Sequence, residues 1–199
     1  GRISAEAIAA IAKSFPIYFT IIAIGVGLTA GTNTLIGNNL GANNKKKASL
    51  FIAQSIIFAI FLSVLVTFFG LNVSDFLLSL MGSDPDGIIL SREYLDIIFY
   101  GTIIVLIQIS LNGTLNAQGD TKSYRNVLIF TFFLNIFLNP LFIFGYGFVP
   151  AFGIAGLAIA TVVAQFTGLL YLAHKVYCCE LKQFLKLECF KNCFNSQQY

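Results

Sequence analysis

Charged residues are scarce in this sequence. Asp, Glu, Lys and Arg together make up 11% of its 199 residues, whereas soluble globular domains contain about 25%. Hydrophobic residues make up 57%, and several apolar runs exceed the roughly 18 residues that indicate a membrane-spanning helix. The shortage of charge excludes an ordinary soluble domain, and we predict an integral membrane protein.

The motifs that carry common chemistry are also missing. The sequence has no nucleophile–base pair, no phosphate-binding loop and no metal-ligand cluster of recognisable spacing, so we expect neither an enzyme nor a cofactor. Its four cysteines gather near the C-terminal end, and together with His174 they match no zinc pattern. The net charge of +3 is spread over segment ends instead of one basic face, which argues against a nucleic-acid partner.

The beginning of the sequence shows no start methionine and no secretory leader. The first residue is Gly1, and neither a charged leader region nor a small-residue cleavage site accompanies the first apolar run. We therefore expect an internal fragment of a longer protein.

Five apolar segments are predicted to cross the membrane as helices. Most have about the 20 residues that ~30 Å of hydrocarbon requires, and the third is longer, so we expect it to tilt or to project. A semi-polar lead at residues 4–13 precedes the first segment. The segments are 16–36, 48–71, 88–115, 127–148 and 154–177.

The basic residues predict the orientation of these segments. Nine of the twelve Lys and Arg residues fall on one side, whereas Arg2, Lys13 and Arg92 fall on the other. Loops rich in Lys and Arg stay in the cytoplasm. We predict a multi-pass protein of the cell membrane whose N-terminal end lies outside and whose C-terminal end lies in the cytoplasm.

Amide side chains are the main polar groups inside the spans, because no charged residue falls in the middle of any span. The spans therefore contain no carboxylate at mid-depth, whereas proton relays commonly use buried carboxylates. Asn135 and Asn139 lie four apart on one helix face, and Pro140 follows, where it removes a backbone hydrogen bond and favours a bend. A second stripe, on the preceding span, consists of Gln108, Asn112 and Asn116.

Each polar residue also has a purely structural interpretation. Amides in membrane helices often join neighbouring helices, Asn116 is close enough to a loop to act as a cap, and Thr161 in the last span can bond to its own backbone. We favour a functional interpretation for Asn112, Asn135 and Asn139 because they form ordered stripes on two consecutive antiparallel spans. Packing is expected for Gln54 and Gln165 and, through close helix approach, for Gly25, Gly27 and Gly31.

Two loops on the lysine-rich side resemble each other. Residues 39–45 and 116–122 each contain a glycine, then polar residues and a lysine. Glycine readily adopts the positive φ that ends a helix. We predict that Gly41 and Gly119 end the helices that precede them.

Several stretches resemble the multidrug and toxic compound extrusion (MATE) transporters, in particular their DinF-like branch. The main ones read Ala-Gln-Gly-Asp-Thr-Lys at 117–122, Asn-Ile-Phe-Leu-Asn-Pro-Leu-Phe-Ile-Phe-Gly at 135–145 and Gly-Ile-Ala-Gly-Leu-Ala-Ile-Ala-Thr at 153–161. The stretch Ile-Gly-Asn-Asn-Leu-Gly-Ala at 36–42 is similar as well. Their order and spacing both fit, and the resemblance covers roughly residues 5–177.

The resemblance implies an all-α polytopic membrane protein, with about five transmembrane helices that resemble helices two to six of a twelve-helix transporter. Such transporters have two six-helix lobes around a central cavity, which they open alternately to the two faces. Residues 1–177 would form most of the first lobe without its first helix, and residues 178–199 a cytoplasmic tail or linker. The implied partners are a second lobe in the same protein, the lipid bilayer and a small-molecule substrate.

The resemblance also implies roles for the polar residues. Asn135, Asn139 and Thr161 match positions that line the first-lobe cavity and contribute to cation coupling, and Asn112 matches a position that contacts drugs. The DinF-like pattern usually has Asp where this chain has Asn139, which can coordinate Na⁺ through its oxygen but cannot titrate. We assign cation binding to Asn135, Asn139 and Thr161, substrate binding to Asn112, Gln108 and Asn135, and a hinge to Pro140.

These features predict a secondary active antiporter that exports organic, mainly cationic, drug-like compounds in exchange for Na⁺ or H⁺. Two alternatives remain open. A lipid-linked sugar flippase of the same superfamily tends to have basic residues in its cavity, and this chain has none at mid-span. A non-transporting membrane subunit would tolerate the loss of the Asn112 and Asn135 side chains together.

Overall fold

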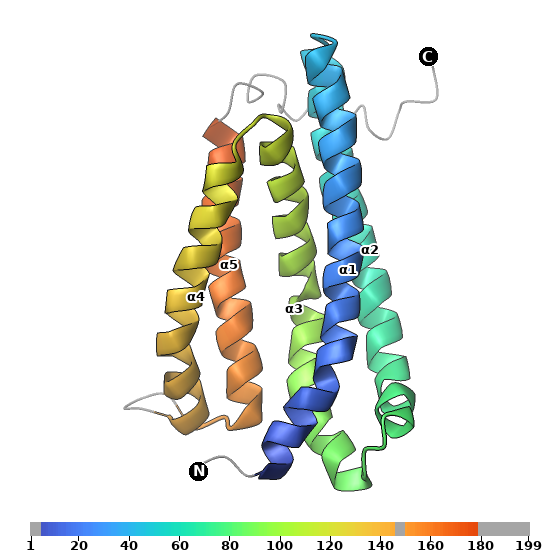
Figure 1. Ribbon diagram of the computed structural model, residues 1–199, viewed down its shortest axis with the longest axis vertical. Coiled ribbons are helices and arrows are strands. Elements are labelled where there is room, and N and C mark those ends of the chain that lie inside the picture. The colour runs from blue at the N-terminus through green and yellow to red at the C-terminus, as the bar shows by residue number, and fades with distance from the viewer. Residues whose placement is uncertain (1–4, 146–149, 179–199) are drawn as a thin grey trace.

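The computed structural model describes residues 5–145 and 150–178, and this part of the chain folds into five long α-helices (Figure 1). All five are long and apolar enough to cross a membrane. The prediction of an all-α polytopic membrane protein is therefore confirmed. In chain order the helices are α1 (Ala5–Gly41), α2 (Lys45–Leu80), α3 (Pro85–Ala117), α4 (Thr121–Phe144) and α5 (Ile154–Cys178).

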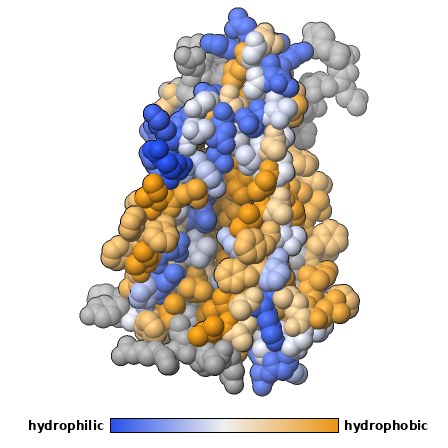
Figure 2. Space-filling view, in the orientation of Figure 1, coloured by the Kyte–Doolittle hydropathy of each residue, from blue (hydrophilic) through white to orange (hydrophobic). Residues whose placement is uncertain are grey.

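The first two helices are longer than the sequence predicts. α1 has 37 residues and α2 has 36, or about 55 Å each at ~1.5 Å per residue, against ~30 Å of hydrocarbon. The semi-polar lead predicted at residues 4–13 belongs to the same helix as the first span, because this alanine-rich stretch is helical from Ala5 onward. Figure 2 shows hydrophobic side chains around the middle of the molecule and hydrophilic ones mainly toward its two ends.

α3 is the central helix of the bundle. It packs against α1, α2 and α5, whereas α4 packs mainly against α5 and touches α3 little (Figure 1). Its buried apolar side chains include Leu95, Phe99 and Leu106. α3 therefore anchors the fold, and the side of α3 toward α4 is the part of the bundle with the loosest backbone packing.

Close helix approach at glycine is found at one of the three predicted positions. A Cβ at Gly25 would lie 2.5 Å from Ile109 Cδ1 of α3, whereas a Cβ at Gly27 or Gly31 would meet nothing within 4 Å. The prediction is therefore confirmed for Gly25 and wrong for the other two. Gly27 and Gly31 lie on a different face of α1 from the face that packs against α3.

The helices that follow the two loops at the lysine-bearing end, α2 and α4, begin with the same capping contact. Asn44 Oδ1 accepts a hydrogen bond from the Lys47 backbone N–H at 3.1 Å, and Asp120 Oδ1 accepts one from the Ser123 backbone N–H at 3.0 Å. The Ser123 hydroxyl also donates to Asp120 Oδ2 at 2.6 Å. This hydroxyl bond is the main cause that holds the pKa of the Asp120 carboxyl below its ordinary value, and the positive charge of Lys175 lowers that pKa further.

The preceding helices end differently in the two loops. Gly119 has the predicted positive φ, 82°. Gly41 is instead the last residue of α1, and Asn43 adopts the positive φ of 57° in this loop. Asn116 lies in the last turn of α3, whose C-cap residue is Gln118. Both helices thus end at or next to the predicted glycine, but the positive φ lies at Gly119 in one loop and at Asn43 in the other, because asparagine also tolerates the left-handed region.

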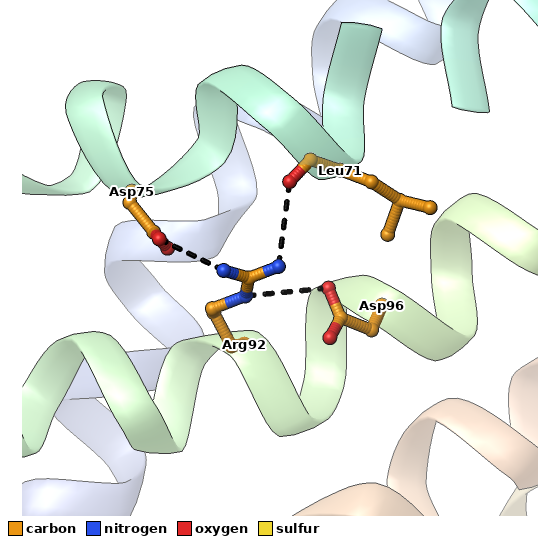
Figure 3. Close-up of polar contacts among 4 residues, drawn as sticks. All are labelled: Leu71, Asp75, Arg92 and Asp96. Carbon is orange, nitrogen blue, oxygen red and sulfur yellow. Dashed lines mark hydrogen bonds and ion pairs between the residues drawn. The ribbon is translucent and has the colours of Figure 1, made fainter. Parts of the chain in front are cut away.

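An ionic cluster joins α2 and α3 at the opposite end (Figure 3). Arg92 of α3 lies 2.8 Å from Asp75 of α2 and 3.6 Å from Asp96, measured from Nη1 and Nε to the nearest carboxylate oxygens. Its Nη2 also donates to the backbone carbonyl of Leu71 at 3.3 Å. One guanidinium thus joins both helices outside the apolar band.

Candidate functional site

Four amide side chains on α3 and α4 have carbonyl oxygens that are shielded from solvent and accept no hydrogen bond from the residues that the structure describes. Two of them, on α3, are buried, with exposed fractions of 2% and 7%. A buried acceptor without a partner costs about 1–3 kcal/mol. A bound solute or a further helix that contacts these oxygens would therefore stabilise the bundle. The four residues are Gln108, Asn112, Asn135 and Asn139, and we refer to them as the amide ladder.

The α4 part of the ladder is held by the backbone of its own helix. Asn135 Nδ2 donates to the Thr131 carbonyl at 3.1 Å, which leaves Oδ1 as the unpaired atom. Asn139 follows one turn later and directly precedes Pro140. Because proline has no N–H, the Ile136 carbonyl receives no helical hydrogen bond from position 140. A backbone oxygen is thereby freed within one turn of both amides.

Thr161 of α5 lies at a depth similar to that of Asn139. Asn139 is 18 residues from the start of α4, and Thr161 is 17 residues from the end of α5, or about 27 Å and about 26 Å from the lysine-bearing helix ends. Thr161 Oγ1 donates to the Leu157 carbonyl at 3.0 Å, as its structural interpretation expects. The hydroxyl oxygen still has lone pairs that can face a cation.

The two α3 amides lie nearer to the lysine-bearing end. Asn112 and Gln108 precede the end of α3 by five and nine residues, or about 8 Å and about 14 Å, whereas Asn135 lies about 21 Å from the start of α4. The structure therefore does not bring Asn112 to the level of Asn135, although both are predicted to contact substrate. The amides are spread over depth and do not form one ring.

Two residues that were not predicted as site residues, Thr131 and Gly168, lie beside the middle of the amide ladder. Thr131 is 5% exposed and lies one turn before Asn135. A Cβ at Gly168 of α5 would lie 3.0 Å from Gln108 Nε2 and 3.4 Å from Thr131 Cγ2, so the Gln108 side chain reaches the contact between α4 and α5. The four-residue spacing that links Thr131 to Asn135 and Asn139 is the signal that could have identified it.

Pro140 lies on the exposed side of α4, which is one continuous helix through this position. The segment after it is tied to the start of α5, because the backbone N–H groups of Phe152 and Gly153 donate to the Phe142 and Ile143 carbonyls at 2.9 Å and 3.3 Å. A hinge at Pro140 stays a prediction. If α4 bends there, its short end remains attached to α5 and its longer part moves.

The chemistry of the ladder is that of neutral oxygens. No Asp, Glu, Lys or Arg lies among these turns, and in the described residues no group of His, Cys, Asp and Glu could hold a metal ion. Amide and hydroxyl oxygens suit hard cations and accept hydrogen bonds from organic cations. A groove of about 850 Å³ lies elsewhere, between α1 and α2, and contains none of the four amides.

The predicted cytoplasmic tail falls almost entirely outside the described residues. Residues 179–199, with three of the four cysteines, are not described. Cys178 is the last residue of α5, and its Sγ lies 3.7 Å from His174 Nε2. Both side chains are exposed.

Comparison with known proteins gives one consistent result. The family model MatE matches residues 1–141. The chain is 32% identical over 168 residues to the probable multidrug resistance protein YoeA of Bacillus subtilis, and 29% identical over 168 residues to the FAD transporter of Shewanella oneidensis. Each match covers 84% of this chain but only 36% and 37% of the relatives. The chain thus spans less than half the length of these relatives.

Solved structures match over nearly the whole chain. The inward-facing conformation of a multidrug resistance MATE family transporter gives a TM-score of 0.82 at 29% identity, and an outward-facing conformation gives 0.80 at 28%. Both matches cover 96% of this chain and 44% of the solved one. The five helices thus match part of a MATE transporter, and the chain belongs to the MatE family, a family of membrane transporters and not of enzymes.

Proposed function

We propose that this chain forms the first lobe of a secondary active antiporter that exports organic, mainly cationic, drug-like compounds in exchange for Na⁺ or H⁺. The observation that carries the proposal is the amide ladder, a row of shielded oxygens without partners on α3 and α4. The similarity to probable multidrug resistance proteins supports it. A closed cavity needs a second lobe, which we expect in the same protein.

The deep end of the ladder suits Na⁺ better than H⁺. Asn135 and Asn139 offer amide oxygens and Thr161 offers a hydroxyl oxygen, and none of the three titrates in the physiological range. A proton stored at this depth would therefore need a side chain other than these three. We infer that Na⁺ binds at this depth, and that the substrate contacts Gln108 and Asn112 nearer to the lysine-bearing end.

The antiport mechanism requires two conformations of the transporter, in which the two lobes pack against each other differently. A cation bound to the oxygens of Asn135, Asn139 and Thr161, which we call the deep oxygens, stabilises the conformation in which these oxygens converge. The substrate stabilises the other conformation. Each ligand shifts the equilibrium only by its difference in affinity for the two conformations. Similar TM-scores against inward-facing and outward-facing structures, 0.82 and 0.80, support a lobe that keeps its helix arrangement while it moves.

Two of the three alternatives involve an anionic substrate, and the third involves no substrate. An anionic dinucleotide or a lipid-linked sugar phosphate would favour basic residues in the cavity, and the ladder contains none. A non-transporting subunit would need none of the unpaired oxygens. The neutral ladder thus supports export of cations over all three alternatives.

We infer that the lysine-bearing end of the bundle lies in the cytoplasm. Nine of the twelve basic residues belong to this side, and basic loops stay inside. In a variant whose native cysteines are replaced by serine, a cysteine placed at the exposed Asn43 would then react with a membrane-impermeant maleimide only after the cells are opened, whereas one at the exposed Asp86 would react in intact cells. The reverse pattern would contradict the orientation.

The transport proposal is tested by dye efflux from proteoliposomes that contain the protein of the complete reading frame. A Na⁺ gradient and a proton gradient are imposed separately. We expect Asn135→Ala to slow Na⁺-driven efflux about tenfold, the effect of losing about 1.4 kcal/mol of cation binding. The matched control is Asn126→Ala, on the exposed side of the same helix, which should change the rate less than twofold. Equal rates for both variants would refute the assigned site.

A further inference from the structure

A groove between α1 and α2 has no part in the proposed exchange. Its volume is about 850 Å³. It is deep because Gly27 and Gly31 have no side chains, and a Cβ at either would meet nothing within 4 Å. Its lining is mostly apolar and includes Gly27, Gly31 and Leu35 on α1, and Phe51, Gln54 and Phe58 on α2.

The depth of the groove corresponds to one membrane leaflet. Leu35 lies six residues before the end of α1, and Phe51 lies six residues after the start of α2, so the groove opens about 9 Å from the lysine-bearing ends. Leu62, its deepest residue on α2, lies 17 residues from the start, or about 26 Å. The resulting length of about 17 Å is close to half of the ~30 Å hydrocarbon core.

Three consecutive lysines stand at the mouth of this groove. Lys45, Lys46 and Lys47 begin α2, and all three are exposed. Lys47 shares a helix face with Phe51 and Phe58, at spacings of four and then seven residues. No Asp or Glu occurs from residue 7 to residue 74. The sequence of both groove walls therefore adds positive charge at the mouth and no negative charge.

We propose that this groove binds an anionic phospholipid of the leaflet next to the lysines. The phosphate lies at Lys45–Lys47 and one acyl chain fills the space above Gly27 and Gly31. Gln54, which is exposed amid apolar side chains, donates its amide N–H to an ester carbonyl of the lipid. An amide that faces hydrocarbon without a partner is costly, so this bond also explains why a glutamine is tolerated there.

A membrane helix is the competing occupant, because Gly27 and Gly31 have the four-residue spacing of helix-packing motifs. Such motifs work when two backbones approach closely. Here the opposite wall carries Phe58 and Phe61, with 52% and 57% of their surface exposed, and these rings hold a second backbone away. A flexible acyl chain can pass between them, and the lysines at the mouth complement a phosphate. The proposal stands independently of the antiport mechanism.

Native mass spectrometry of the complete protein in detergent tests the proposal. The probes are phosphatidylglycerol, phosphatidylcholine with the same acyl chains, and glycerol phosphate. We expect phosphatidylglycerol to bind about tenfold more tightly than phosphatidylcholine, in line with the attraction of anionic lipid surfaces for clustered lysines. Glycerol phosphate should not compete, because it lacks the acyl chain. Competition by glycerol phosphate would point to a free-phosphate site and overturn the proposal.

Two variants and their matched controls separate the headgroup from the groove. The variant Lys45→Gln/Lys46→Gln/Lys47→Gln should lose the preference for phosphatidylglycerol, and Lys122→Gln, at the same end on α4, should keep it. Gly31→Leu should abolish retention of both lipids, whereas Gly37→Leu, elsewhere on α1, should not.

Unchanged phosphatidylglycerol binding by the triple variant would overturn the proposal, and this result remains informative if Gly31→Leu fails to fold. Loss of a monodisperse protein in Gly31→Leu together with unchanged lipid binding in the triple variant would assign the groove to a protein helix.

Discussion

The contact between α4 and α5 at Gly156 makes a sharp prediction. A Cβ at this position would clash with the Phe142 carbonyl and would lie 3.0 Å from the Ile143 backbone nitrogen. Both neighbours are backbone atoms, which cannot swing aside as a side chain can. Gly156→Ala must therefore push the two helices apart or distort the junction that Phe152 and Gly153 form with α4.

The magnitude follows from two opposing effects. Overpacking a close contact costs about 1–3 kcal/mol, and replacing glycine by alanine in a helix returns about 0.5–1 kcal/mol. We expect a net loss of about 1–2 kcal/mol for Gly156→Ala. Gly37→Ala is the matched control, because a Cβ at Gly37 meets nothing within 4 Å, and this variant should be neutral or slightly stabilised.

The assay is thermal unfolding of the complete protein in detergent, followed as loss of the monodisperse peak in size-exclusion chromatography. In a protein of about 150–250 residues, ~1 kcal/mol corresponds to about 2–4 °C in Tm, and the shift is smaller in a longer protein, so Gly156→Ala should melt measurably below Gly37→Ala. If the two variants melt at the same temperature, α4 and α5 do not approach as closely at Gly156 as described.

Further predictions concern the ends of the bundle and the cation site. Arg92→Met removes the ion pair with Asp75, which is partly exposed, so it should cost at most about 1 kcal/mol, and adding salt should shrink the difference in Tm from wild type. Because the pKa of Asp120 is lowered in the folded protein, its ionised form stabilises the fold above the ordinary value of 3.8, and this contribution is lost as the pH falls through the lowered pKa. Asp120→Asn keeps an oxygen that can accept from Ser123 but cannot titrate, so Tm should fall less on acidification than in wild type. Asn139→Asp introduces a titratable group at the deep oxygens, and efflux driven by a proton gradient should increase relative to Na⁺-driven efflux in the proteoliposome assay.

The helices could be predicted from the sequence, but their ends could not. Five apolar runs separated by polar turns are sufficient for the number and order of spans, because the hydrocarbon core demands about 20 apolar residues each time. Beyond the core this demand disappears, and the chain stays helical wherever local propensity and contacts allow. The continuation of α2 to Leu80 is an example, since Asp75 in its last turns pairs with Arg92 of α3.

The stripes of the candidate site could be predicted from spacing, whereas their relative depth could not. A four-residue interval places Asn135 and Asn139 on one face whatever surrounds them. The level of Asn112 relative to Asn135 depends on where the 118–120 loop ends one helix and starts the next. The role of Gly168 depends on which α3 side chain meets it, and that side chain is Gln108. Both are tertiary properties that a single sequence does not contain.

The position of the unpaired oxygens suggests why cation binding and helix movement are coupled. They lie on α3 and α4, which touch each other little, whereas α4 is held mainly by α5. Each unpaired oxygen costs about 1–3 kcal/mol, so a ligand that engages two of them recovers free energy comparable to typical allosteric couplings of about 1–3 kcal/mol. If α3 and α4 were well packed against each other, this free energy would only stabilise their existing arrangement. Because that contact is sparse, the same energy becomes available to move α4, and we expect the cation to change the position of α4 more than that of α1.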